Sequence, residues 1–332
     1  MNVARTFALG VAICVALTAC GQQSSEPSTG PMSVHRLHHH LNPPSRPDCG
    51  SSTVLRSVAT LPIRVYRHQA SSSVLVNACF GGKGPFLMIV DTGSDTTIIT
   101  RSLAKRLHLP TVGRAKQFGS AHCHGTATQA VLPTWSLNHI RLPGQLVAVV
   151  QAQGLGGAGQ PQGTIGADVL SSFASVGINY QTKQMTVAAK YRGINDVNGG
   201  QPEIEAPLII HREEGRVITR VSVDIRGHTE KWLPDTGSLH SVVDTEKAKL
   251  AGLPETGALV HEVSLCGAFR VPEVRSGAWA LAGHPLEPEA LAVAPLEGQI
   301  DADGILGSPT LSRYGTIVFD WEGRRLLLGR RP

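Results

Sequence analysis

Two aspartates of this 332-residue chain stand in the same four-residue setting. Asp91 begins Asp-Thr-Gly-Ser directly after the apolar run FLMIV, and Asp235 begins the same tetrapeptide 144 residues later. A carboxylate at the end of so apolar a strand is costly to bury unless it is paired or neutralised. Two carboxyls at one site do not both ionise easily, so one can act as a base while the other keeps its proton. The plainer explanation is two unrelated turns, because Asp and Gly are common turn residues.

The sequences around the two aspartates repeat over a long stretch. Residues 91–110 align with residues 235–254 without a gap, and residues 163–187 align with residues 304–328, each opening with Gly-x-x-Gly. The distance from Asp to the first Gly is 72 residues in one copy and 69 in the other. Matched motifs at matched spacing indicate an internal duplication.

Each copy has the pattern of a small β domain. SVLVNACF and FLMIV flank a Gly- and Pro-containing turn, which predicts a hairpin that ends at the first aspartate. SLAKRLHL and ADVLSSF predict short helices, as do EKAKLAGL and SPTLSRY in the second copy. The predicted lobes span residues 58–190 and 204–332, and the segment between them carries linker signals.

The paired Asp-Thr-Gly-Ser and Gly-x-x-Gly motifs resemble those of aspartic proteases of the pepsin and retropepsin kind. The resemblance covers roughly residues 58–332 and implies an all-β, bilobal acid-protease fold with short helices. It also implies an endopeptidase in which Asp91 and Asp235, one from each lobe, activate a water molecule against a peptide bond. Such a protein needs no metal or other cofactor, acts on polypeptides and is expected to be a monomer whose two lobes form a pseudo-dimer.

The resemblance assigns roles to the neighbours of the two aspartates. The threonines would hydrogen-bond across the lobes, the glycines would let backbone approach the carboxyls, and the serines would donate to the outer carboxylate oxygens. These supporting residues are Thr92, Gly93, Ser94, Thr236, Gly237 and Ser238. Gly166 and Gly307 would pack the following turns against the loops of the two aspartates.

One departure separates the two copies. Pro234 precedes Asp235 where Val90 precedes Asp91, and proline removes a backbone donor from a strand. Either that strand end has no ladder partner or the second loop is remodelled. The alternative function is therefore a non-catalytic peptide- or protein-binding module with a degraded protease cleft.

The N-terminus has the pattern of a bacterial lipoprotein. Arg5 and a short apolar run predict a signal peptide over residues 1–19, and LTAC resembles a lipobox that ends at Cys20. Cys20 would carry the lipid, palmitate included, and residues 21–57 would form a flexible tether. An ordinary cleaved signal is the alternative. We expect a lipid-anchored, periplasm-facing protein of the bacterial cell envelope, on the outer membrane if the cell has two.

Other partners find little support in the sequence. The net charge of +5 and the absence of a Lys/Arg track argue against nucleic acid. His122, Cys123 and His124 lie together, but no second ligand pair stands at a metal-binding spacing.

Four cysteines follow Cys20 in the chain. Cys123 and Cys266 lie 32 and 31 residues after their aspartates, so they are equivalent positions of the repeat. In retropepsin-like proteins this region is the flap over the cleft. A disulfide between Cys123 and Cys266 would join the flaps, leaving Cys49 and Cys79 free or paired. Two unlinked cysteines on symmetry-related strands are the alternative.

Overall fold

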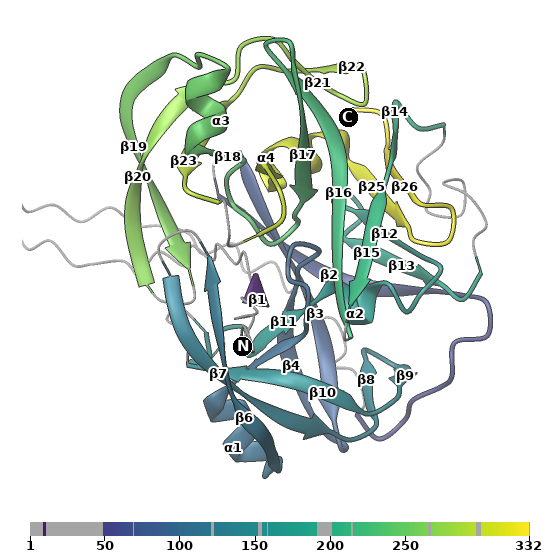
Figure 1. Ribbon diagram of the computed structural model, residues 1–332. Coiled ribbons are helices and arrows are strands. Elements are labelled where there is room, and N and C mark those ends of the chain that lie inside the picture. The colour runs from purple at the N-terminus through teal and green to yellow at the C-terminus, as the bar shows by residue number, and fades with distance from the viewer. Residues whose placement is uncertain are drawn as a thin grey trace, which may run out of the picture.

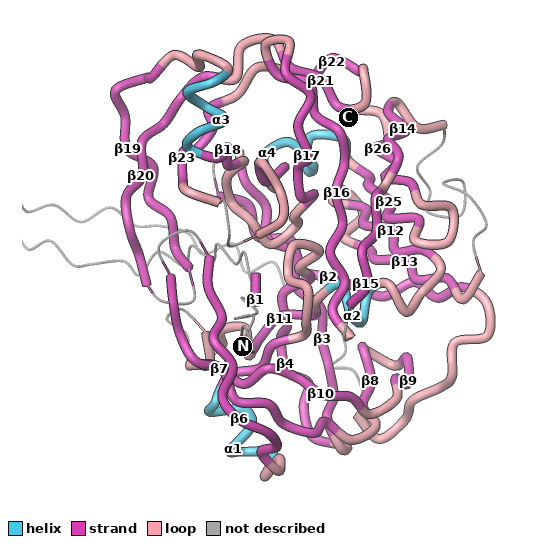
Figure 2. The backbone as a smooth tube through the Cα atoms, viewed as in Figure 1, coloured by secondary structure: helices cyan, strands magenta, loops and turns pink. Residues whose placement is uncertain are grey.

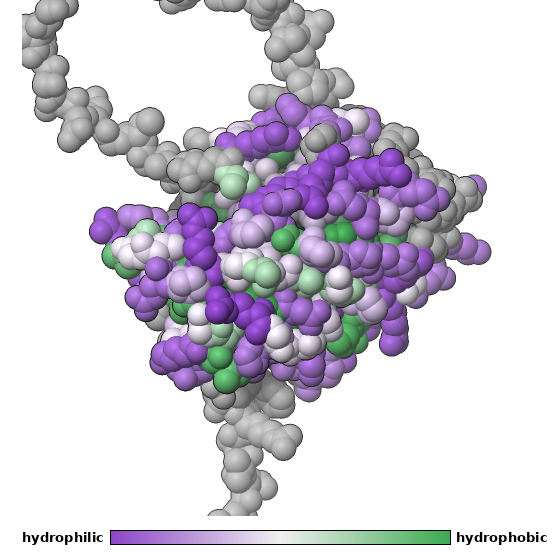
Figure 3. Space-filling view, turned by 90° about the horizontal axis from the view of Figure 1, so that it is seen from above, coloured by the Kyte–Doolittle hydropathy of each residue, from purple (hydrophilic) through white to green (hydrophobic). Residues whose placement is uncertain are grey.

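The computed structural model describes residues 9–10, 49–68, 70–120, 123–151, 155–157, 159–190, 201–213, 215–264, 267–296 and 300–331. Two lobes built mostly of strands form its body (Figures 1 and 2). Among the described residues, no helix is long and apolar enough to cross a membrane. On the face shown in Figure 3, hydrophobic side chains form small separate patches among hydrophilic ones.

The first lobe contains the predicted hairpin before Asp91, formed by the antiparallel strands β3 and β4. The hairpin that carries Asp91 turns at Gly81 and Gly82, so the following Lys-Gly-Pro belongs to a strand instead of the turn. The strands are β2 (Val58–His68), β3 (Ser71–Phe80), β4 (Lys83–Val90), β5 (Ile98–Thr100), β6 (Thr111–Ser120), β7 (Cys123–Leu132), β8 (Trp135–Leu137), β9 (Ile140–Leu142), β10 (Gln145–Val150), β11 (Gly163–Ile165), β12 (Ser175–Asn179) and β13 (Gln184–Ala188). A two-residue strand, β1 (Leu9–Gly10), pairs in parallel with Phe118 and Gly119 of β6.

The second lobe repeats this order. Its hairpin turns at Arg226 and Gly227 and runs on to Pro234. The strands are β14 (Ile204–Pro207), β15 (Ile209–Glu213), β16 (Arg216–Ile225), β17 (His228–Pro234), β18 (Val242–Asp244), β19 (Glu255–Ser264), β20 (Gly267–Arg275), β21 (Trp279–Leu281), β22 (His284–Leu286), β23 (Ala290–Ala294), β24 (Gly304–Leu306), β25 (Thr316–Asp320) and β26 (Arg325–Leu328).

The helices are short and begin at equivalent positions of the repeat. They are α1 (Arg101–Leu107), α2 (Ala167–Leu170), α3 (Thr245–Leu250) and α4 (Ser308–Leu311), with a 3₁₀ turn, η2, at Ser312–Tyr314. Thr100 caps α1 by accepting from the Leu103 amide at 3.2 Å, and Asp244 caps α3 by accepting from the Glu246 amide at 2.9 Å. Asp244 also accepts from the Lys247 amide at 3.3 Å, so the caps satisfy one free amide of the first turn in α1 and two in α3.

A continuous sheet joins the two lobes. β12 of the first lobe pairs antiparallel with β25 of the second, which places β2, β13, β12, β25, β26 and β14 side by side. The hairpins β6–β7 and β19–β20 extend from opposite lobes on the same side of the molecule (Figure 1). The all-β bilobal architecture expected from the duplication is confirmed.

Most buried apolar side chains form one core, but each lobe also has a small separate cluster. The first cluster is Leu75, Ile89, Ile98, Ala127, Ala148, Val150 and Leu155. The second is Leu233, Val242, Val260, Val271, Ala292, Ala294, Leu296 and Ile305. Strand alternation explains the division, because successive side chains point to opposite faces of a sheet. Val90 and Ile99 face the main core, whereas their neighbours Ile89 and Ile98 face away from it.

A disulfide joins Cys49 to Cys79 of β3, across a sequence separation of 30 residues. Of the two outcomes left open for these cysteines, the structure has the paired one. The bond ties the segment before β2 to the hairpin that carries Asp91.

Candidate active site

The two aspartates directly follow equivalent strands, because Asp91 comes after β4 and Asp235 comes after β17. The Asp91 amide donates to the Ile165 carbonyl at 3.0 Å, and the Asp235 amide donates to the Leu306 carbonyl at 2.9 Å. In both lobes the strand before the aspartate runs parallel to the Gly-x-x-Gly strand, β11 or β24.

Pro234 does not disturb this arrangement. It lies opposite Leu306 in the parallel ladder, as Val90 lies opposite Ile165. The amide that donates at this point belongs to Asp235, so the donor that proline lacks is not needed there. The second loop therefore keeps the geometry of the first.

The two loops exchange hydrogen bonds through their threonines. The Thr92 hydroxyl donates to the Pro234 carbonyl at 2.8 Å, and the Thr236 hydroxyl donates to the Val90 carbonyl at 2.7 Å. Each hydroxyl also accepts from the amide of the other threonine, at 3.1 and 3.2 Å. The contact predicted across the lobes is present in both directions. It locks the two loops in register because all its groups are buried.

Glycine is required beside each carboxyl. A Cβ atom on Gly93 would lie 2.2 Å from Cγ of Asp235, and one on Gly237 would lie 2.6 Å from Cγ of Asp91. Each glycine thus faces the aspartate of the other lobe. The two carboxyls can approach each other only because neither loop carries a side chain at these positions.

The carboxylates are held by backbone amides. Asp91 Oδ1 accepts from the Gly93 and Ser94 amides at 3.2 and 2.9 Å, and Asp235 Oδ1 accepts from the Gly237 and Ser238 amides at 2.7 and 3.1 Å. The serine hydroxyls are used elsewhere, because Ser94 donates to the Thr96 carbonyl and Ser238 to the His240 carbonyl, both at 2.7 Å. Ser94 and Ser238 thus donate to the carboxylates through the main chain.

Both carboxyl groups are fully buried, and their pKa values are raised. Burial raises the pKa of Asp91 well above its usual range, and the nearby Asp235 carboxyl raises it further. Burial raises the pKa of Asp235 to about 6, against the opposing effect of the Gly237 amide. Asp91 Oδ2 and Asp235 Oδ2 make no hydrogen bond within the described residues, and each carboxyl lies beside the glycine of the other loop. The pair therefore holds one proton over the range between its two pKa values.

The Gly-x-x-Gly turns pack against the aspartate loops as predicted. The Ala167 amide donates to the Ser94 carbonyl at 2.7 Å, and the Ser308 amide donates to the Ser238 carbonyl at 2.9 Å. A Cβ on Gly307 would lie 2.2 Å from the His240 carbonyl oxygen, so only glycine fits this contact. Gly166 makes the same close approach to Thr96.

Behind each turn lies a buried polar group that the sequence analysis missed. In the first lobe Thr97 donates to Asp168 of α2 at 2.7 Å and accepts from the Gly166 amide at 3.1 Å, while Gln145 donates to Asp168 at 3.3 Å. Burial raises the pKa of Asp168 to about 6.

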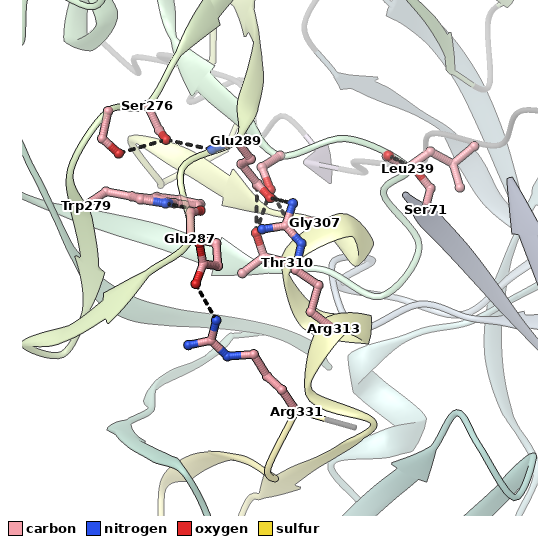
Figure 4. A network of polar contacts seen from close by, with 12 residues as sticks. Ser71, Leu239, Ser276, Trp279, Glu287, Glu289, Gly307, Thr310, Arg313 and Arg331 are labelled. Atoms are coloured by element: carbon pink, nitrogen blue, oxygen red, sulfur yellow. Dashed lines mark hydrogen bonds and ion pairs between the residues drawn. The ribbon is translucent and has the colours of Figure 1, made fainter. Parts of the chain in front are cut away.

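In the second lobe the acid of the equivalent support is Glu289, which lies just before β23 instead of on the helix. Thr310 of α4 donates to Glu289 at 2.6 Å, and Arg313 pairs with Glu289 at 3.0 Å (Figure 4). Ser241 accepts from the Gly307 amide at 3.1 Å and contacts the Thr310 hydroxyl at 3.3 Å. Glu289 and Gln145 are equivalent positions of the repeat, 144 residues apart. A comparison of the two copies at this position could have indicated the polar support in both lobes.

An ion pair also crosses between the lobes. Arg216 Nε of β16 donates to Asp95 Oδ2 at 2.6 Å, and the Val217 amide donates to the Asp95 carbonyl at 3.1 Å. Burial raises the pKa of Asp95 to about 6, although Arg216 opposes the shift. The pair is asymmetric, because Leu239 occupies the equivalent position of the second loop.

Several predicted residues fall outside this geometry. Cys20, His122 and Cys266 lie outside the described residues, and of Cys123 and His124 only the backbone of β7 is described. The disulfide between the flaps and the lipidated cysteine therefore stay predictions.

Comparison with known proteins agrees with this architecture. A family model described as "Aspartyl protease" matches residues 76–169 and 221–310, one match in each lobe and together more than half of the chain. The chain belongs to this aspartyl protease family. No curated protein matches the sequence.

Three solved structures are similar to this chain at low identity. Conglutin gamma, a basic 7S globulin from lupine seeds, is 13% identical with a TM-score of 0.46, over 82% of this chain and 95% of that one. Basic 7S globulin from soybean is 14% identical with a TM-score of 0.43, over 82% and 94%. Aspartic proteinase from Irpex lacteus is 13% identical with a TM-score of 0.46, over 82% and 97%.

Proposed function

We propose that this protein is an aspartic endopeptidase that hydrolyses peptide bonds with a water molecule held between Asp91 and Asp235. The observation that carries the proposal is the buried pair of carboxyls, each placed by the same loop and turn in its own lobe. Burial and mutual repulsion give the pair two separate pKa values, as acid–base work on one substrate requires.

The roles follow from the two environments. The Gly237 amide donates to Asp235 at 2.7 Å, whereas the equivalent Gly93 amide donates to Asp91 at 3.2 Å. The shorter bond favours the ionised form of Asp235, which therefore takes the proton of the attacking water. Asp91 keeps its proton, donates it to the carbonyl oxygen of the scissile bond and so stabilises the tetrahedral intermediate. The proton on Asp235 then passes to the leaving nitrogen as the C–N bond breaks. A hydroxyl of the tetrahedral intermediate returns its proton to Asp91 as the new carboxyl group forms, and the pair is back in its starting state.

The alternative, a peptide-binding module with a degraded cleft, was motivated by Pro234. The undisturbed ladder and the retained Thr92–Thr236 exchange remove that reason and support the catalytic proposal. The test is a proteome-wide cleavage profile of wild-type protein against Asp91→Asn, with and without a transition-state mimic of the statine type. We expect discrete cleavage sites in the wild-type profile alone, and the mimic should remove them. A wild-type profile identical to that of Asp91→Asn would instead favour the binding module.

We also propose that Cys20 is lipidated and anchors the protein in the bacterial cell envelope, facing the periplasm. The support is the sequence LTAC after a short apolar run, followed by a Ser- and Pro-rich tether. Mass spectrometry of protein purified from membranes should find acyl chains on Cys20, and Cys20→Ser should release the protein into the soluble fraction. Unmodified Cys20 in the membrane-purified protein would contradict the anchor.

A further inference from the structure

The two lobes carry opposite net charges. Residues 58–190 contain 11 Lys and Arg residues against 3 Asp and no Glu, which gives the first lobe a net charge of +8. Residues 204–332 contain 14 Lys and Arg residues against 18 Asp and Glu, which gives the second lobe a net charge of −4. Such an asymmetry within one chain is a property of the surface, and it determines what the first lobe attracts.

The first lobe exposes no acidic side chain to solvent. Asp91 and Asp95 are buried, and Asp168, held by Thr97 and Gln145, is not exposed either. Its basic residues are distributed in the opposite way, because every one whose side chain the structure describes is exposed. These are Arg64, Arg67, Lys83, Arg101, Lys105, Arg106, Arg141, Lys183 and Lys190.

Five of these cations lie at one end of the first lobe, which we call the basic pole. Helix α1 and the β3–β4 hairpin lie at the end of the lobe that points away from the second lobe (Figure 1). The Arg106 guanidinium lies 4.6 Å from the centroid of the Phe86 ring, which joins the helix to the hairpin. The ladders β3–β8 and β8–β9 bring the fifth cation to the same end. The basic pole consists of Lys83, Arg101, Lys105, Arg106 and Arg141.

The charges of the basic pole are not neutralised within the protein. None of the five cations forms an ion pair with a carboxylate in the part of the chain that the structure describes. In the second lobe, by contrast, Lys247 of α3 pairs with Asp303 at 3.0 Å and Lys249 pairs with Glu246 at 2.8 Å. Lys249 is the repeat equivalent of Lys105. The uncompensated charge therefore belongs to the first copy alone.

The N-terminal segment joins the body at the basic pole. A Cβ atom on Gly84 would lie 3.1 Å from Cys49 Sγ, so Cys49 packs directly beside the β3–β4 turn. Ser52 Oγ accepts from Arg141 Nε at 3.2 Å. Residues 21–57 have a net charge of only +1, from 3 Arg against 1 Glu and 1 Asp, and so do not offset the basic pole.

The candidate active site lies at the other end of the same strand. β4 begins at Lys83 and ends at Val90, directly before Asp91. At the rise of an extended strand, Lys83 and Asp91 are roughly 25 Å apart. A surface that contacts the basic pole therefore does not cover the two aspartates.

We propose that the basic pole docks on anionic phospholipid headgroups and so holds the Asp91–Asp235 pair away from the membrane. The choice of a membrane rests on the proposed anchor at Cys20, because a tether that joins the body at the basic pole keeps headgroups within its reach. A flexible tether alone does not fix the orientation of the body. Each basic residue near an anionic membrane strengthens binding about fivefold, and salt screens this attraction.

The test measures binding of the full chain with Cys20→Ser, which cannot carry the proposed lipid, to two kinds of vesicle. At low salt it should bind vesicles that contain phosphatidylglycerol about a hundredfold more tightly than vesicles of phosphatidylcholine alone, and high salt should abolish the difference. Lys83→Gln combined with Lys105→Gln should weaken binding to the anionic vesicles about 25-fold. Both side chains are exposed, so equal urea midpoints should confirm that the fold is kept.

The matched control combines Arg226→Gln with Lys249→Gln. It makes the same change of charge at the equivalent hairpin turn and helix of the second lobe, and binding should stay within about twofold. Equal binding of the Cys20→Ser chain to both kinds of vesicle would overturn the inference. So would an equal loss in both double variants, because the attraction would then come from overall charge instead of the basic pole.

A second copy of the chain is the other occupant that the charges allow, since the basic lobe of one molecule could contact the acidic lobe of the next. Sedimentation at low salt detects it. A dimer that is lost in the Lys83→Gln, Lys105→Gln variant, without vesicle binding, would assign the basic pole to that contact and overturn membrane docking. None of these results depends on lipidation or on peptidase activity, so the inference and the proposed function can fail separately.

Discussion

Replacing Asp235 with Asn is expected to stabilise the protein at neutral pH. The carboxyl of Asp235 is fully buried, and burial raises its pKa from 3.8 to about 6. The folded state therefore binds the proton more tightly than the unfolded state does. The stabilisation from this proton is complete below pH 3.8 and is lost as the pH rises through about 6.

The size of the effect follows from the two pKa values. A pKa raised from 3.8 to about 6 corresponds to about 3 kcal/mol between acid and neutral pH. Asparagine does not titrate, and its side-chain oxygen can still accept from the Gly237 and Ser238 amides. Asp235→Asn should therefore match wild type near pH 3.5 and exceed it by about 3 kcal/mol at pH 7.

Urea unfolding at pH 3.5, 5 and 7, with the Cys49–Cys79 disulfide kept oxidised, measures this difference. Asp224→Asn is the matched control, because that carboxyl lies at an exposed hairpin end beside Thr229 and should give no comparable gain. A variant at position 235 that is less stable than wild type at pH 7, or equally stable at all three pH values, would refute the reasoning. Either result would mean that burial does not raise the pKa of Asp235 in the folded protein.

Three further predictions concern the dyad, the lobe contact and the disulfide. In a pH–rate profile, kcat/KM should rise through about pH 6, where Asp235 ionises, and fall only at a higher pH, where the second proton leaves the pair. A maximum well below pH 5 would contradict the raised pKa values. Thr92→Ala should cost about 2–4 kcal/mol in urea unfolding because it removes two buried hydrogen bonds, whereas Thr92→Ser keeps the hydroxyl and should cost much less. Cys79→Ser should lower the free energy of unfolding by about 3–4 kcal/mol, because the disulfide closes a loop with a sequence separation of 30 residues. The kcat of the folded variant should stay within about twofold of wild type, and an unchanged unfolding midpoint would show that the bond is not formed.

The sequence predicted what repeats within it. Two copies of Asp-Thr-Gly-Ser at matched distances from Gly-x-x-Gly are sufficient to predict the duplicated hairpins and the short helices. These features depend on local pattern and on symmetry, both of which can be read along the chain. The reciprocal threonine contact was implied by the family resemblance that these motifs carry.

The contacts that distinguish the lobes were not predicted. The pairing of Asp95 with Arg216 joins residues 121 positions apart, and Thr310 meets Glu289 across a turn. Which buried acid meets which donor depends on side-chain geometry that no periodicity encodes. The effect of Pro234 was left open for the same reason, because only the ladder shows that the donating amide belongs to Asp235.

The central claim is that Asp91 and Asp235 act as one unit. Single-turnover hydrolysis of one cleaved peptide by wild type, Asp91→Asn, Asp235→Asn and the double variant tests it most directly. A shared dyad predicts that each single variant loses essentially all activity and that the double variant loses no more, because residues acting as a unit are not additive. An Asp235→Asn enzyme that hydrolyses the peptide at close to the wild-type rate would contradict the claim.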